Sequence, residues 1–141
     1  MDPLSVFASA IAITQATESL MSLLLQWKSA PDEVTALFNE LSDLKIALHN
    51  ASVAAKANHH LMSKQVSEDM RGTLQRIENK VEELDAIVQS VIIRVPDNIN
   101  WERTKIKRLK WMPMKSKVYG LTQELRQLKS TLLIQQTSVN S

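Results

Sequence analysis

The chain lacks cysteine and contains little glycine or proline: its 141 residues include no cysteine, two glycines and four prolines. Without cysteine, neither a disulfide framework nor a thiolate metal site can form, and a reducing compartment fits this composition. The scarcity of glycine and proline leaves few sharp turns, which disfavours an all-β domain and favours long helices. Hydrophobic residues make up 44% and charged residues 23%, a balance typical of a soluble globular domain.

Charge is also missing from the first part of the chain, where Pro3 to Thr17 contains no charged residue. A signal peptide is disfavoured because Asp2 stands where such peptides have Lys or Arg. A constitutive membrane span is disfavoured because serine, threonine, glutamine and Glu18 interrupt the apolar run. We therefore predict a helix from Asp2-Pro3 to about Lys28 with two apolar surfaces, mostly covered by other helices. The spacing of Ala8, Ala12 and Ala16 suits close helix packing in a bilayer and in a soluble bundle alike.

Three later segments place apolar residues at alternating steps of three and four. The predicted second helix runs from Asp32 to about Ala57-Asn58, and the last runs from about Met114 to Gln136. The third has the longest seam and is expected to stop at Pro96-Asp97-Asn98. Its seam consists of Met70, Leu74, Ile77, Val81, Leu84, Val88, Val91 and Val95. The seams indicate either a bundle core or an intermolecular coiled coil.

The predicted fold class is all-α, an antiparallel bundle of four long helices plus one short basic amphipathic helix. Residues 1–136 form a single helical bundle domain in this interpretation, and 137–141 form a disordered tail. The short helix spans Trp101 to Met112 and ends before Pro113. On a helical wheel, its apolar residues Trp101, Ile106, Leu109 and Met112 fall on one side.

The stretch from 101 to 117 is strongly basic, with Glu102 as its single acid. Its basic interface candidates are Arg103, Lys105, Lys107, Arg108, Lys110, Lys115 and Lys117. Three interpretations remain open: a packed linker helix with a solvated basic face, a contact with an anionic membrane surface, and a contact with nucleic-acid phosphates. Nucleic acid is the least favoured partner because no helix-turn-helix or RNA-binding motif accompanies the charge.

Motifs of catalysis and metal binding are absent from the sequence. There is no nucleophile motif and no phosphate-binding glycine loop, so we expect neither an enzyme nor a cofactor. His49, His59 and His60 have no zinc-site spacing, and adjacent histidines on a helix point about 100° apart. We therefore expect solvated surface histidines instead of metal ligands.

Three stretches resemble the HeLo-like N-terminal domain family of fungal STAND and NLR-type proteins. They are MDPLSVFASAIAITQ at the start, TESLMSLLLQWKSAPDEVTALFNELSDLKIAL from Thr17, and KSKVYGLTQELRQLKSTLLIQQ from Lys115. The opening Met-Asp-Pro-Leu-Ser and the Leu-x2-Leu-Lys-Ser pattern from Leu125 to Ser130 are both familiar in that family. The resemblance covers about residues 1–136 and consists mainly of patterns of apolar residues.

The resemblance implies a helical bundle, which in some members executes cell death when its N-terminal helix leaves the bundle, oligomerises and inserts in the plasma membrane. The inserting residues carried over by position are Leu4, Val6, Phe7, Ile11, Ile13 and Leu20. It also implies protein partners or self-association, and a cytoplasmic location, peripheral to the plasma membrane. No nucleotide-binding module, repeat or prion-forming tail follows the bundle, so the chain is either part of a longer protein or a stand-alone member. A stand-alone member favours the alternative role of accessory protein in a fungal azaphilone-pigment or other secondary-metabolite cluster, where metabolite binding is an open question.

Overall fold

Four long helices make up most of the computed structural model: α1 (Pro3–Leu25), α2 (Asp32–Ala57), α3 (Lys64–Ile92) and α5 (Lys115–Asn140). A 3₁₀ turn, η1 (Met112–Met114), leads directly into α5. The structure describes residues 3–27, 30–92 and 109–140. Within these ranges every regular element is helical, which confirms the all-α bundle. The predicted cap Asp2, seam residue Val95 and stop at Pro96-Asp97-Asn98 lie outside the described residues.

The helix ends follow local chemistry. α2 starts after Pro31, whose carbonyl accepts a hydrogen bond from the Val34 amide at 3.0 Å. It ends where Asn58 donates from both its backbone N–H and its side-chain Nδ2 to the Ala54 carbonyl. At the start of α3, the Ser63 hydroxyl accepts a bond from the Val66 amide at 3.1 Å, a serine N-cap. With this cap, α3 begins at Lys64, more than one turn before Met70, the first residue of its predicted seam.

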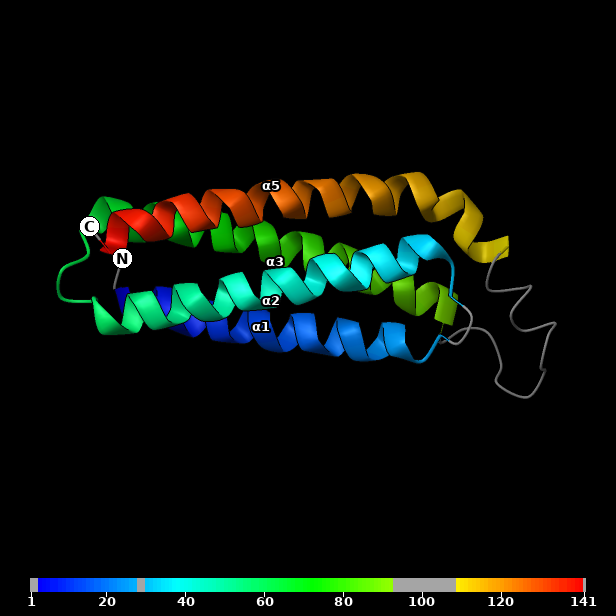
Figure 1. Ribbon diagram of the computed structural model, residues 1–141, viewed down its shortest axis with the longest axis horizontal. Coiled ribbons are helices and arrows are strands. Elements are labelled where there is room, and N and C mark those ends of the chain that lie inside the picture. The colour runs from blue at the N-terminus through cyan, green and yellow to red at the C-terminus, as the bar shows by residue number, and fades with distance from the viewer. Residues whose placement is uncertain (1–2, 28–29, 93–108, 141) are drawn as a thin grey trace.

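Consecutive long helices run in opposite directions, and both described termini lie at the same end of the bundle (Figure 1). α1 packs against α2 and α3, and α5 packs against the same two helices. α1 and α5 are therefore diagonal partners, as are α2 and α3. The connection between Asn58 and Ser63 thus crosses from one diagonal helix to the other, so α1 has a parallel neighbour, α3, as well as an antiparallel one, α2.

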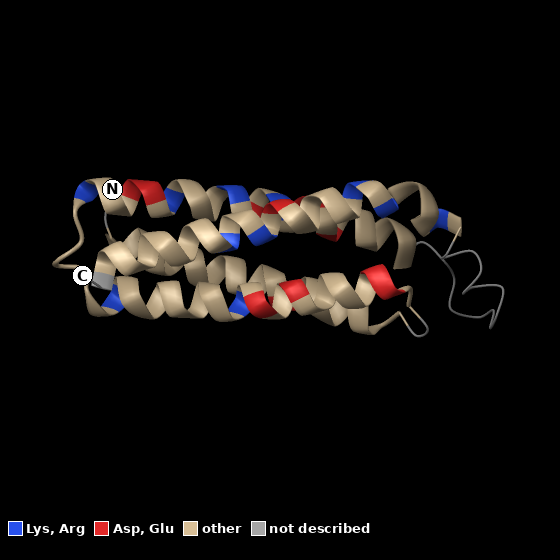
Figure 2. Cartoon of the chain, turned by 45° about the horizontal axis from the view of Figure 1, so that its top comes forward, with Lys and Arg blue, Asp and Glu red and all other residues tan. Residues whose placement is uncertain are grey.

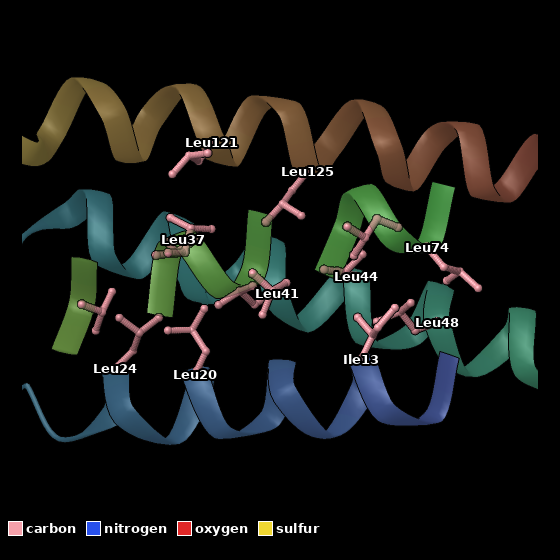
Figure 3. Packing of buried hydrophobic residues seen from close by; sticks show 14 of the residues in the cluster. Ile13, Leu20, Leu24, Leu37, Leu41, Leu44, Leu48, Leu74, Leu121 and Leu125 are labelled. Carbon is pink, nitrogen blue, oxygen red and sulfur yellow. The ribbon is translucent and has the colours of Figure 1, made fainter. Parts of the chain in front are cut away.

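Leucine and isoleucine side chains from the four long helices point into one central space (Figure 3). The predicted seam of α3 from Met70 to Val91 is buried throughout. In α5 the predicted seam consists of Val118, Leu121, Leu125, Leu128 and Leu132; all are buried except Leu128, which is partly buried and packs against the core. The heptad pattern therefore serves the intramolecular core, the first of its two interpretations.

The last helix continues beyond its predicted end at Gln136. α5 extends to Asn140, and Val139 is buried in the core cluster near the N-terminal end of α1. The expected disordered tail from 137 is therefore helical as far as 140. The reason is that Val139 lies seven residues after Leu132, on the same helix face, and so continues the apolar seam.

Candidate functional site

The six candidate inserting residues of α1 divide into two groups. Val6, Ile13 and Leu20 are buried in the core, with exposed fractions of 0%, 1% and 0%. They share this inward side of the helix with Leu23 and Leu24. In the packed bundle these three side chains are thus part of the core and are out of reach of any partner.

The other three candidates form the second apolar surface of α1, which the bundle covers only in part. Leu4 is 44% exposed and Ile11 is 37% exposed, whereas Phe7 is partly buried against the core. The Lys56 ammonium of α2 lies 5.3 Å above the Phe7 ring, in a cation–π arrangement. The prediction that both apolar surfaces would be mostly covered is wrong for the outward one, because only α2 and α3 flank α1.

The outward face of α1 contains a single charged residue, Glu18. The exposed residues of the helix are Leu4, Ala8, Ile11, Ala12, Gln15, Glu18, Ser19, Ser22 and Leu25. Among the described residues, α1 is the one helix long and apolar enough to cross a membrane, with 33% of its most apolar window buried. Core helices of soluble proteins and signal sequences have the same length and composition.

Glu18 and Ser9 of α1 make polar contacts with the neighbouring helices. Glu18 forms an ion pair with Lys45 of α2 at 3.3 Å, and both side chains are almost half exposed. Arg71 of α3 donates a hydrogen bond to the Ser9 hydroxyl. Exposed ion pairs contribute about 0–1 kcal/mol, so burial of apolar side chains supplies most of the attachment of α1.

α5 is connected to the same two neighbours by a larger set of charges. Glu40 of α2 is 5% exposed; it accepts a hydrogen bond from Arg126 at 3.2 Å and forms an ion pair with Lys129 at 2.9 Å, both on α5. On the other flank, Lys80 of α3 pairs with Glu124 of α5 at 2.8 Å. Sequence reasoning missed this cluster, although the position of Glu40 between Leu37 and Leu44 in an apolar seam could have indicated it.

Two of these ion pairs shift the pKa of one partner. The Lys115 ammonium, 2.6 Å from Glu33, donates a hydrogen bond that lowers the pKa of the Glu33 carboxyl below its ordinary 4.5. A backbone hydrogen bond at Glu33 acts in the same direction. The hydrogen bond to Glu124 raises the pKa of Lys80 above 10.5. Both pairs therefore hold their charged forms over the physiological pH range.

The basic stretch is described only from residue 109 onward; Arg103, Lys105, Lys107, Arg108 and the wheel residues Trp101 and Ile106 lie outside the described residues. Lys110, Lys115 and Lys117 are all exposed, and Lys115 is paired with Glu33. The expected apolar side of this helix is exposed in its described part, since Leu109 is 60% and Met112 is 63% exposed. The bundle instead buries Trp111, one position from Met112 and on a different face of the helix.

Trp111 closes the end of the core near the start of α5. Its ring meets that of Trp27 edge to face, with 5.5 Å between centroids and an interplanar angle of 85°. Trp27 is 4% exposed and Trp111 1%, and neither indole N–H has a partner among the described atoms. The pair links the turn after α1 to the segment before α5. An open pocket of about 360 Å³ beside it is lined in part by Pro31, Glu33, Trp111 and Lys115.

Over the described ranges, no three His, Cys, Asp or Glu side chains gather where a metal ion could bind. His49, His59 and His60 are exposed. The rings of His59 and His60 lie 5.5 Å apart, edge to face, because these residues occupy the turn after α2 and not a continuous helix.

Comparison of the chain with protein-family models, with curated proteins and with solved structures gave no match. The features that bear on function are therefore those of the molecule itself: the nearly uncharged outward face of α1, its exposed Glu18–Lys45 ion pair, and the exposed apolar and basic residues around η1.

Proposed function

We propose that the protein is a non-enzymatic helical association module that binds anionic membranes through α1 and the start of α5. The observation that carries this proposal is the contrast within α1: one face is in the core, and the other is exposed, almost uncharged and apolar over its N-terminal half, from Leu4 to Ala12. The resemblance to HeLo-like domains points in the same direction, and the location expected from it is cytoplasmic, at the inner side of the plasma membrane.

The exposed surface around η1 supplies a first contact with lipid. Leu109 and Met112 present apolar side chains to solvent next to the exposed cations Lys110 and Lys117. Apolar side chains between cations suit the headgroup region of an anionic bilayer, where each nearby cation contributes about 1 kcal/mol. A nucleic acid would use the cations but would leave Leu109 and Met112 without a role.

Insertion of α1 would follow as a second step. Removing Val6, Ile13 and Leu20 from the core costs roughly 1.5–3 kcal/mol for each side chain. A domain is stable by only about 5–15 kcal/mol in total, so α1 leaves the bundle only where a bilayer or an oligomer covers the same side chains. Glu18 and Lys45 lose little when they separate, because both already contact water.

The test is dye leakage from vesicles of phosphatidylcholine with increasing phosphatidylserine, in low and high salt. We expect the wild type to cause leakage that rises with phosphatidylserine and falls with salt. Leu4→Glu/Ile11→Glu should abolish most of this leakage, because two charges would enter the apolar face. The matched control is Leu61→Glu/Ile134→Glu, which changes two exposed apolar residues outside α1 and the start of α5. Equal leakage by the two double variants, or none by the wild type, would refute the proposal.

A further inference from the structure

α2 has a second seam on the outside of the bundle. Asp43, Ile46, Asn50, Val53 and Ala57 follow one another at steps of three and four, the spacing of a coiled-coil stripe, and all five are exposed. Ile46 is 59% exposed and Val53 is 52% exposed. The inward seam of α2 is separate and complete, so the outward seam has no role in the described core.

A groove beside this stripe widens the surface towards α5. It has a volume of about 280 Å³ and is lined by Asn50, Val53, Ala54, Ala57, Asn58 and Gln136. Leu133 is 42% exposed. It lies one turn from Lys129, which contacts α2, and one turn from Gln136, which lines the groove, so it borders the same surface.

The charge on this surface decides what kind of partner it fits. From Ile46 to Asn58, α2 has one charged residue, Lys56, whose ammonium lies over the Phe7 ring. From Ser130 onward, α5 has none (Figure 2). A two-fold axis brings a surface patch against itself, where net charge would repel but a neutral patch does not. The stripe itself contains the Asp43 carboxylate and no cation, so it offers no attraction to anionic lipid headgroups, and Asn50 would be costly in hydrocarbon.

We propose that this stripe is a self-association surface, on which α2 of a second copy packs antiparallel around a two-fold axis at Asn50. Each Asn50 amide then lies on the axis and faces its own copy, where the two amides can each donate one hydrogen bond and accept one. Ile46 of one copy meets Val53 of the other. The antiparallel direction also places Asp43 against Ala57 and next to Lys56, whereas a parallel pair would bring two Asp43 carboxylates together. The stripe belongs to α2 and not to α1, so the inference goes beyond membrane binding and is tested without lipid.

Sedimentation velocity over a wide range of protein concentration measures the association directly. We expect a monomer–dimer equilibrium in the wild type. Ile46→Lys/Val53→Lys should raise the dimer Kd by about 100-fold or more, since two apolar contacts near the axis are lost and cations face each other. Tyr119→Lys/Ile134→Lys, on the exposed side of α5, should leave the Kd unchanged. A wild type that is monomeric at every concentration would overturn the proposal.

Cysteine crosslinking tests the geometry and does not depend on the folding of the lysine variants. The chain contains no cysteine, so each introduced thiol is unique. Asn50→Cys should form a disulfide-linked dimer rapidly on mild oxidation, and Ile134→Cys should not. Asp43→Cys should crosslink to Ala57→Cys in a mixture of the two variants and poorly to itself. Efficient crosslinking of Asp43→Cys to itself, or equal rates for Asn50→Cys and Ile134→Cys, would contradict the antiparallel pair.

Discussion

α1 and α5 occupy equivalent places in the bundle, diagonally opposite each other and packed against the same two helices, yet their chemistry differs. Among the described contacts, α1 is attached by apolar burial, the exposed Glu18–Lys45 ion pair, the Arg71–Ser9 hydrogen bond and the Lys56–Phe7 cation–π contact. α5 adds to its own apolar seam an ionic cluster at Glu40 and a further ion pair on each side.

This difference indicates which of the two helices is the better candidate to leave the bundle and enter a bilayer. Apolar side chains are stabilised by a protein core and by hydrocarbon alike, because both remove them from water. Ion pairs such as Glu40–Lys129 are stabilised only beside their partner, since an unpaired charge in a medium of low dielectric is costly. We therefore expect α1 to lose less of its attachment energy than α5 on transfer to a bilayer.

The largest expected effect comes from equal truncations on the two helices. Leu20 of α1 and Leu125 of α5 are both 0% exposed. Leu20→Ala and Leu125→Ala should each lower the free energy of unfolding by about 3–5 kcal/mol, because each leaves a cavity. Urea unfolding followed by circular dichroism measures this loss.

The two truncations should differ in vesicle leakage. Leu20→Ala weakens the attachment of α1 itself and should increase leakage, whereas Leu125→Ala should increase it less at the same loss of stability. Equal increases would show that general destabilisation, and not release of α1, produces leakage.

Substitutions around Glu40 test how much the ion pairs of α5 contribute to stability. Arg126→Met/Lys129→Met leaves a buried carboxylate without a cation and should cost about 2–4 kcal/mol, near the lower end for buried pairs because Arg126 is half exposed. Glu18→Gln, which breaks the exposed pair of α1, should cost about 0–1 kcal/mol. Chemical unfolding of both variants gives the two values. Similar losses would remove the distinction between the two helices.

The sequence was sufficient to predict the helices and the core, because periodicity at steps of three and four reports directly which face is buried. It was not sufficient to predict which apolar surface of α1 remains open, since that depends on how many neighbours surround the helix. The burial of Trp111 in place of Leu109 and Met112 depends on where the chain enters α5, a tertiary property. The ionic cluster at Glu40 could not be predicted, because it depends on the register between α2 and α5, which no local sequence pattern contains. The extension of α5 to Asn140 could have been predicted, because Val139 continues the apolar seam.

A smaller effect is expected at the aromatic contact between Trp27, which follows α1, and Trp111, which precedes α5. Trp111→Phe removes part of the edge-to-face contact with Trp27 but leaves no hydrogen bond broken, because the indole N–H has no partner among the described atoms. The expected loss of stability is about 0.5–1.5 kcal/mol by thermal or urea unfolding. In a Trp101→Phe background, Trp27 fluorescence should also shift to longer wavelength, as water reaches the indole. An unchanged spectrum would show that Trp27 is shielded without Trp111.

The smallest effect concerns pH and the pair Glu33–Lys115. Since the folded-state pKa of Glu33 is lowered, the pair contributes stability above the ordinary carboxyl pKa of 4.5 and loses it as pH falls through the lower folded value. Both side chains are more than one-third exposed, so the contribution is at most about 1 kcal/mol. Glu33→Gln should therefore lower the urea midpoint at pH 7 and leave it nearly unchanged at pH 3. Asp32→Asn, which removes the neighbouring exposed carboxyl at the same helix end, is the matched control. If Glu33→Gln lowered the midpoint equally at both pH values, packing and not charge would explain its effect, and the ionic attachment of α5 would rest on Glu40 and Lys80 alone.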